Sequence, residues 1–155
     1  MPREAFDEEL RALQEQILKM GGLVEEAVRR AVRSLADQDL EEAERIIEGD
    51  DMIDRVQQEI EEKSLKLIAL QQPLARDLRT VTTILKVMID LERIGDHAVN
   101  IALITRRIGH EPLIKPLIDI PRMADLTDRM LKGSLDALVR RDVTLAEQIC
   151  HSDDE

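Results

Sequence analysis

The sequence contains no tryptophan, no tyrosine and one phenylalanine. Because 43% of its residues are hydrophobic, the core must be built from Leu, Ile, Val, Ala and Met, which suits packed helices. A single cysteine, Cys150, excludes an internal disulfide framework and fits a reducing compartment. No apolar run approaches the roughly 20 residues that cross a bilayer, and the N-terminus has no apolar signal region. These absences predict a cytoplasmic protein that meets a membrane only peripherally, through partners.

Acidic residues outnumber basic ones: the sequence has 33 Asp and Glu and 22 Lys and Arg, which gives a net charge of −11. This balance argues against nucleic acid as the main partner, because the phosphate backbone attracts cationic surfaces. It suits either cation binding or plain solubility. A length of 155 residues allows one domain and part of another.

Three long helical patterns come first. In the earliest, apolar residues recur at steps of three and four, as in the seam of a helical bundle. The seam continues through two adjacent glycines and consists of Leu10, Leu13, Ile17, Met20, Val24, Ala27, Ala31 and Leu35.

The later helices are delimited by caps and prolines. A second helix is expected from a cap at Asp37 or Asp39 to about Leu70. A third should have Pro73 in its first turn and end near Ile108. A linker with two prolines follows, then a helix over about 120–140 and another from about residue 142.

The chain also repeats itself at a shift of 103 residues. Met20 then meets Met123, Leu35 meets Leu138, and the acidic pair at 50–51 meets the pair at 153–154. Chance similarity between helical patterns is the alternative, but a shared helix break and acidic pair favour two copies of one supersecondary unit.

The repeat sets the expected organisation. Residues 1–109 should form a first three-helix bundle, 110–119 a linker, and 120–155 the start of a second bundle. The expected fold is therefore all-α: tandem antiparallel three-helix bundles, the second incomplete. An incomplete bundle exposes an apolar face, so we expect a partner chain or a homo-oligomer.

Two carboxylate pairs stand out. Glu92 and Asp96 fall within the apolar arc of the third helix. Asp50 and Asp54 form a similar pair on the second helix, and they either face inward or sit at the margin of its apolar face. In a hairpin that turns at Gln72, the first pair lies 20 and 24 residues after the turn and the second 22 and 18 before it. At about 1.5 Å per residue, both pairs should sit about 30 Å from the turn. The four carboxylates should therefore converge.

Such a cluster has three explanations. All-oxygen ligands suit a hard cation such as Mg²⁺, Mn²⁺, Ca²⁺ or iron. The second explanation is that the carboxyls share protons, and the third is that they lie solvated or paired with arginine at the edge of the bundle. Asn100, Asp51 and Asp153 are candidates for extra or supporting ligands, and Gly95 sits where another helix or an ion could approach.

A basic stripe lies on the outer face of the third helix. It consists of Arg76, Arg79, Lys86 and Arg93. Such a stripe is commonly a solvated helix face, but it also suits docking of an acidic partner or an anionic lipid. Catalytic signatures are absent: the sequence has no Glu-x-x-His, no glycine-rich phosphate loop and no nucleophile elbow.

A family resemblance rests on three motifs. They are Gln72-Pro-Leu-Ala-Arg-Asp-Leu-Arg79, then Asp90-Leu-Glu-Arg-Ile-Gly-Asp96 with Lys86 before it, and Asn100-Ile-Ala102. Over these motifs the chain resembles the PhoU family, with one full unit at about 1–109 and the start of a second.

The resemblance implies tandem three-helix bundles and Asp/Glu-x-x-x-Asp metal motifs, here carried onto Asp50, Asp54, Glu92 and Asp96. The metal would be bound as a multinuclear cluster or a single ion, its identity open among iron, zinc, manganese and magnesium. The implied role is non-enzymatic: a negative regulator that links the ATPase of a phosphate ABC transporter to a sensor histidine kinase. The alternatives are a metal-dependent enzyme on a helical bundle and a purely structural helical adaptor.

Overall fold

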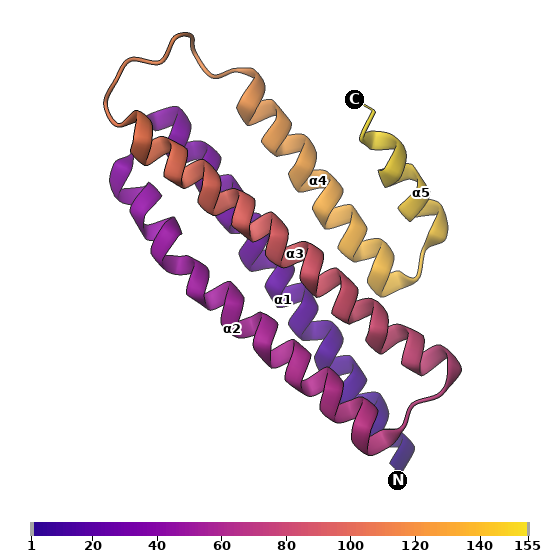
Figure 1. Cartoon of the computed structure of the whole chain (residues 1–155). Coiled ribbons are helices and arrows are strands. Elements are labelled where there is room, and N and C mark those ends of the chain that lie inside the picture. Colours follow the sequence, from indigo (N-terminus) through magenta and orange to yellow (C-terminus); the bar gives the residue numbers. More distant parts are fainter. Residues whose placement is uncertain (1, 155) are drawn as a thin grey trace.

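The computed structural model describes residues 2–154, and over this range it is all helix and connecting turns, without a strand. The helices are α1 (Pro2–Asp37), α2 (Leu40–Gln71), α3 (Ala75–Ile108), α4 (Asp119–Arg140) and α5 (Val143–Ser152). Helices α1, α2 and α3 run side by side as a long antiparallel bundle, and α5 folds back along α4 (Figure 1). The all-α expectation is confirmed.

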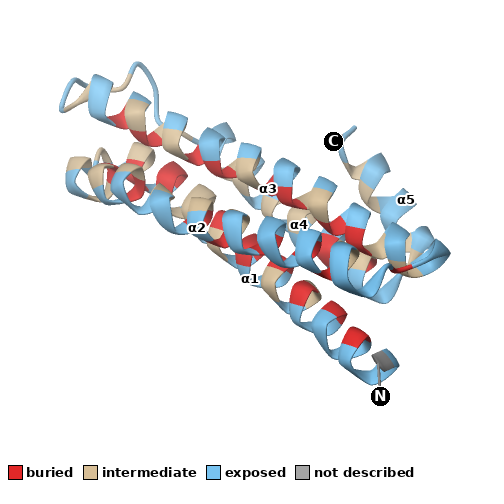
Figure 2. Cartoon of the chain, turned by 60° about the horizontal axis from the view of Figure 1, so that its bottom comes forward, coloured by how far each residue is buried: buried red, intermediate tan, exposed pale blue. Residues whose placement is uncertain are grey.

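The apolar seam of α1 forms the centre of the core. Leu13, Ile17, Met20 and Val24 are at most 1% exposed, and they pack with buried aliphatic residues of α2 and α3. Phe6 is the one aromatic residue in this cluster. Figure 2 shows buried positions following the facing sides of the three helices, with exposed positions outside. The aliphatic core inferred from composition is therefore the observed one.

Aspartates begin two of the helices. Asp39 caps α2, since its Oδ1 accepts a hydrogen bond from the Glu42 backbone N–H at 3.0 Å. Asp142, which is 103 residues further along the chain, caps α5 in the same way, accepting from the Leu145 N–H at 2.9 Å. Asp39 rather than Asp37 is thus the cap, and the repeat extends to the cap itself.

The expected position of Pro73 in the first turn of the third helix is wrong. Helix α3 begins at Ala75, and its N-cap is Leu74, which has an extended backbone. Gln72 ends α2 in the left-handed conformation, with φ 45°. The chain then needs extended residues to reverse direction, and the fixed φ of proline suits such a segment as well as it suits a helix. Pro73 is buried at this turn.

The segment between α3 and α4 is held to the bundle by one side chain. Gln38, at the turn after α1, donates from Nε2 to the carbonyl oxygens of Gly109 at 3.1 Å and Glu111 at 2.6 Å. Helix α4 then returns antiparallel to α1. No helix within residues 2–154 combines the length and apolar character that a membrane crossing requires.

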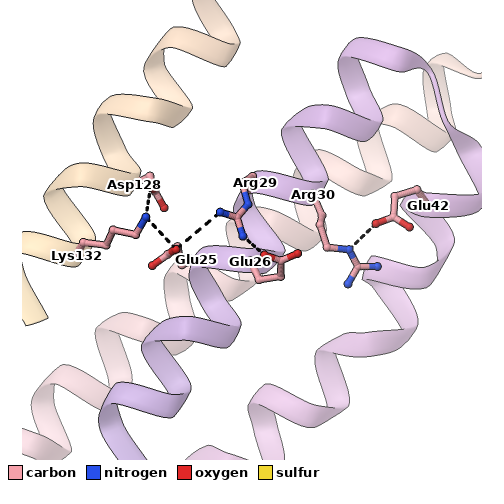
Figure 3. Close-up of polar contacts among 7 residues, drawn as sticks. All are labelled: Glu25, Glu26, Arg29, Arg30, Glu42, Asp128 and Lys132. Atoms are coloured by element: carbon pink, nitrogen blue, oxygen red, sulfur yellow. Dashed lines mark hydrogen bonds and ion pairs between the residues drawn. The ribbon is translucent and has the colours of Figure 1, made fainter.

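The α1–α4 contact combines a close approach with an ion-pair network. A Cβ atom added at Gly21 would lie 2.2 Å from Leu135 Cδ1, so this glycine makes room for α4. Lys132 Nζ lies 3.2 Å from Glu25 Oε1 and 2.9 Å from Asp128 Oδ2 (Figure 3). Under the 103-residue shift, Glu25 corresponds to Asp128. Equivalent parts of the two repeats therefore face each other across this contact.

Candidate metal centre

The four carboxylates named by the sequence lie between α2 and α3. Asp50 and Asp54 come from α2, and Glu92 and Asp96 come from α3. Asp96 is exposed and the other three are half-buried. The cluster thus occupies the margin of the apolar faces rather than their centre. This position lets the carboxylates keep part of their hydration while remaining within reach of one another.

Electrostatic coupling shows that both pairs share one environment. Partial burial raises the pKa of Asp50, and repulsion from Asp54, Asp96 and Asp51 raises it further. Burial also raises the pKa of Glu92, as do a hydrogen bond with Asp96 and the charges of Asp96, Asp54 and Asp50. The hairpin therefore brings the two pairs to the same level, as the counting of residues from the turn predicted.

The cluster is not neutralised by nearby bases. Within the described part of the chain, none of these four carboxylates has a Lys, Arg or His within ion-pair distance. Residues 2–154 therefore do not show the arginine pairing that the third explanation allowed, but the partly hydrated position of the carboxylates at the bundle edge agrees with the other form of that explanation. The raised pKa of Glu92, caused by burial and by the neighbouring Asp96, agrees with the shared-proton explanation.

The donor set fits a hard cation, because carboxylate oxygens are the ligands such ions prefer. Over residues 2–154, however, no three or more His, Cys, Asp or Glu side chains are already arranged to hold an ion. Binding would therefore require side-chain rotation from the mutually repelling arrangement. The uncompensated negative charge provides the driving force for that rotation.

Gly95, between Glu92 and Asp96 in sequence, is buried at the crossing of the helices. A Cβ atom there would lie 3.4 Å from Ile53 Cδ1 and 3.8 Å from Val24 Cγ2. An alanine would make ordinary contacts, whereas a larger side chain would push α2 and α3 apart. The approach that the sequence suggested at Gly95 is therefore made by the apolar side chain of Ile53.

The remaining candidates are dispersed. Asp51 and Asn100 are exposed, and of these Asp51 acts on Asp50 through its charge. Asp153 follows α5 and lines a different surface, a mainly apolar groove of about 1350 Å³ between α1, α3 and the α4–α5 hairpin.

Only part of the basic stripe on α3 lines this groove. Arg76 and Arg79 line it, whereas Lys86 and Arg93 do not. The groove adds Arg141, from the turn between α4 and α5, which the sequence pattern did not single out. Its Nη2 donates to Thr80 Oγ1 at 3.2 Å, so residues 61 positions apart meet.

The raised pKa values predict how metal-free stability depends on pH. Because the pKa values of Asp50 and Glu92 are higher in the folded state, the unfolded chain releases these protons first. Their contribution to stability is therefore complete below the unfolded pKa, near 4, and is lost as pH rises through the folded pKa. We expect an Asp50→Asn/Glu92→Gln variant to match the wild type in acid and to exceed it at neutral pH. Denaturant unfolding in chelator, repeated across this range, measures the difference; a constant difference would contradict the assignment.

Comparisons of the sequence with known proteins all point to one family. The model of the PhoU domain matches residues 17–105 and 120–155. The chain is 41% identical to the phosphate-specific transport system accessory protein PhoU homolog of Clostridium acetobutylicum, over 100% of this chain and 71% of that protein. It covers 59–66% of the length of further curated PhoU relatives.

Solved structures agree with this match. The crystal structure of PhoU from Pseudomonas aeruginosa superimposes with a TM-score of 0.90 at 35% identity, covering 96% of this chain and 72% of that one. The phosphate transport system regulatory protein PhoU from Streptococcus pneumoniae gives 0.88 at 35% identity, with 96% and 70% covered. In sequence and in fold, the chain belongs to the PhoU family.

Proposed function

We propose that this chain is an accessory protein of phosphate uptake: a non-enzymatic, metal-binding adaptor in the cytoplasm. It would act as a negative regulator of phosphate uptake and of phosphate-regulon signalling, linking the ATPase of a phosphate ABC transporter to a sensor histidine kinase. The relatives support the accessory part of this role, since their names assign them to a phosphate-specific transport system. The kinase link and the direction of regulation come from the family resemblance.

The observation that carries the metal-binding part is the uncompensated carboxylate cluster. Asp50 and Asp54 on α2 would bind the ion together with Glu92 and Asp96 on α3. When bound, the cation supplies charge neutralisation and a cross-link between the two helices. The carboxylates themselves draw together as their repulsion is relieved, which fixes the outer surface of the α2–α3 pair for recognition by a partner.

A reporter in living cells tests the regulatory role. In a bacterium whose own PhoU gene is deleted, the wild-type chain should restore repression of a phosphate-starvation promoter in phosphate-rich medium. The Asp50→Asn/Glu92→Gln variant should accumulate to the same level and restore less. Failure of the wild-type chain to repress, with normal accumulation, would overturn the regulatory proposal; full activity of the variant would separate regulation from the carboxylates.

The other two functional classes gain less support. A metal-dependent enzyme needs a positioned acid or base beside an open ligand position, and no observation in residues 2–154 favours one. A purely structural adaptor does not explain why Asp50, Asp54 and Asp96 lie close enough to repel one another. Turnover of a phosphoester by metal-loaded protein would favour the former, and protein free of metal after growth in several media would favour the latter.

A further inference from the structure

The end of the α2–α3 hairpin carries four exposed leucines within 14 positions of the sequence. Their exposed fractions are 55% for Leu65, 69% for Leu70, 79% for Leu74 and 36% for Leu78. Figure 1 shows this end of the hairpin projecting past the turn between α4 and α5. A group of large apolar side chains that water surrounds marks a surface that binds another protein or a membrane.

The same segment is basic, although the chain as a whole is acidic. Residues 63–89 contain five basic residues and one acidic residue, which gives them a charge of +4 in a chain of −11. The single acid, Asp77, is paired, since its Oδ2 lies 3.0 Å from Arg3 Nη1. The five bases are all exposed and are Lys63, Lys66, Arg76, Arg79 and Lys86. The hairpin end therefore attracts anionic surfaces, which most of the remaining molecule repels.

The leucines and the bases lie at different distances from the turn. Leu70 and Leu74 are two residues from Gln72, whereas the four nearest bases are four to nine residues from it. At about 1.5 Å per residue, these leucines lie about 3 Å from the turn and the bases about 6–14 Å from it. A bilayer interface has the same order, with hydrocarbon beneath and lipid phosphates above. Apolar side chains of peripheral proteins enter it by about 5–10 Å.

The shape of this end favours a membrane over a protein partner. None of the four leucines lines the groove of about 1350 Å³ or the cavity of about 380 Å³ between α1 and α2. Projecting side chains require a matching hollow in a protein, whereas a fluid bilayer adapts to them. Helix α1 begins at the same end and brings the acidic residues Glu4, Asp7, Glu8 and Glu9. Contact with an anionic surface is therefore confined to the α2–α3 side.

We infer that the end of the α2–α3 hairpin binds the surface of an anionic lipid bilayer. Leu70 and Leu74 enter the interface, and the four bases nearest the turn lie at the level of the lipid phosphates. The binding is peripheral, since no helix within residues 2–154 is long and apolar enough to cross a membrane. The inference requires neither the proposed accessory role nor the metal. It also differs from the sequence-based expectation, in which membrane contact occurs only through partners.

Sedimentation with vesicles tests the electrostatic part. The wild-type chain should bind vesicles of mixed phosphatidylcholine and phosphatidylglycerol, more weakly as salt increases, and should bind phosphatidylcholine alone poorly. Each base close to an anionic surface contributes a factor of about five. Neutralising four bases should therefore weaken binding more than about tenfold, in the variant Lys63→Gln/Lys66→Gln/Arg76→Gln/Arg79→Gln.

The control removes the same charge from exposed bases elsewhere on α1, α2 and α3. It should change binding less than about threefold, because solvent screens charges beyond a Debye length. The control variant is Lys19→Gln/Arg33→Gln/Arg55→Gln/Arg93→Gln. Circular dichroism checks that both variants are folded.

A fluorophore on the hairpin end tests insertion. Cys150 is the one cysteine of the chain, so Cys150→Ser provides a background for labelling. An environment-sensitive dye at Leu74→Cys should shift its emission to the blue on mixed vesicles. The same dye at Ile104→Cys, which is exposed near the other end of α3, should not. Leu70→Ser/Leu74→Ser should weaken binding about tenfold, whereas Met52→Ser/Ile104→Ser should leave it unchanged.

Three results would overturn the inference: no binding of the wild type to mixed vesicles, equal weakening in the two four-base variants, or no blue shift at position 74. Binding of polyglutamate by a chain that ignores vesicles would indicate an acidic protein partner instead. The Asp50→Asn/Glu92→Gln variant should bind vesicles at least as tightly as the wild type. Failure of membrane binding and failure of metal binding are thereby distinguished.

Discussion

An excess of Mn²⁺ is expected to raise the unfolding temperature of the wild-type chain and to leave the Asp50→Asn/Glu92→Gln variant unchanged. A ligand that binds only the folded state stabilises it by about 2.7 kcal/mol at 100 times Kd. For a domain of this size, that corresponds to roughly 5–10 °C. The amides preserve the shape of the carboxylates but remove the charge and most of the ligand strength that a hard cation requires.

The same variant should behave in the opposite way without metal. In chelator at neutral pH, Asp50→Asn/Glu92→Gln removes two partly buried charges and their repulsion with neighbouring carboxylates, the causes of both raised pKa values, so it should be more stable than the wild type. Glu61→Gln/Asp90→Asn is the matched control, because it removes two exposed carboxylates from the same helices. Equal stabilisation of all three proteins by Mn²⁺ would show that the cation acts through general charge screening.

Two adjacent glycines in α1 should respond with opposite signs. Alanine at Gly21 would place Cβ 2.2 Å from Leu135 Cδ1, whereas at Gly22 nothing lies within 4 Å. We therefore expect Gly22→Ala to stabilise the chain by up to about 1 kcal/mol through helix propensity. Gly21→Ala gains the same propensity but must displace Leu135 or α4, an overpacking cost of about 1–3 kcal/mol. Denaturant unfolding of the two variants measures the difference.

The site of the effect can be localised. Gly21→Ala should increase amide hydrogen exchange in α4 and α5 and leave the exchange of backbone amides near the α2–α3 carboxylates unchanged. Within residues 2–154, α4 makes close backbone contact with α1 and not with α2 or α3. Shortening the obstructing side chain, in Gly21→Ala/Leu135→Ala, should cost less than the two single changes combined. Strict additivity of the two changes would show that the close approach of α1 and α4 is not limiting.

Several helix boundaries could be predicted from the sequence because they have a local signal. Asp39 and Asp142 are caps, and the break at 71–73 is marked by glutamines and a proline. The start of α3 was wrong because proline satisfies both a helix first turn and an extended segment. Only the left-handed backbone of Gln72, which depends on how α2 and α3 pack, distinguishes the two.

The carboxylate cluster could be predicted from the sequence for a geometric reason. Counting residues from a hairpin turn fixes the level at which two helices meet, so Asp50 and Glu92 were placed together without knowledge of the packing. How deeply these carboxylates are buried could not be predicted from the sequence. A helical projection gives the direction of a side chain but not its distance from the neighbouring helix. Asp50 and Asp54 lie at the margin of the apolar face, one of the two positions expected for them, and Glu92 is half-buried beside them.

The sequence pattern did not predict the contacts between the two repeats. Arg141 meets Thr80 only because the α4–α5 turn comes back to the start of α3. One signal was present: at a shift of 103 residues, Glu25 and Arg29 become Asp128 and Lys132. The same order of charges thus occurs on α1 and α4, and Lys132 contacts Glu25 and Asp128 there (Figure 3).

Elemental analysis of the purified protein tests the central claim most directly. Wild-type chain and an Asp50→Ala/Glu92→Ala variant would be exposed to the same mixture of iron, zinc, manganese and magnesium salts, then desalted. The account predicts bound metal in the wild type and its loss in the variant, with helical circular dichroism retained in both. Equal metal in the two proteins, or none in either, would contradict a metal centre formed by these carboxylates.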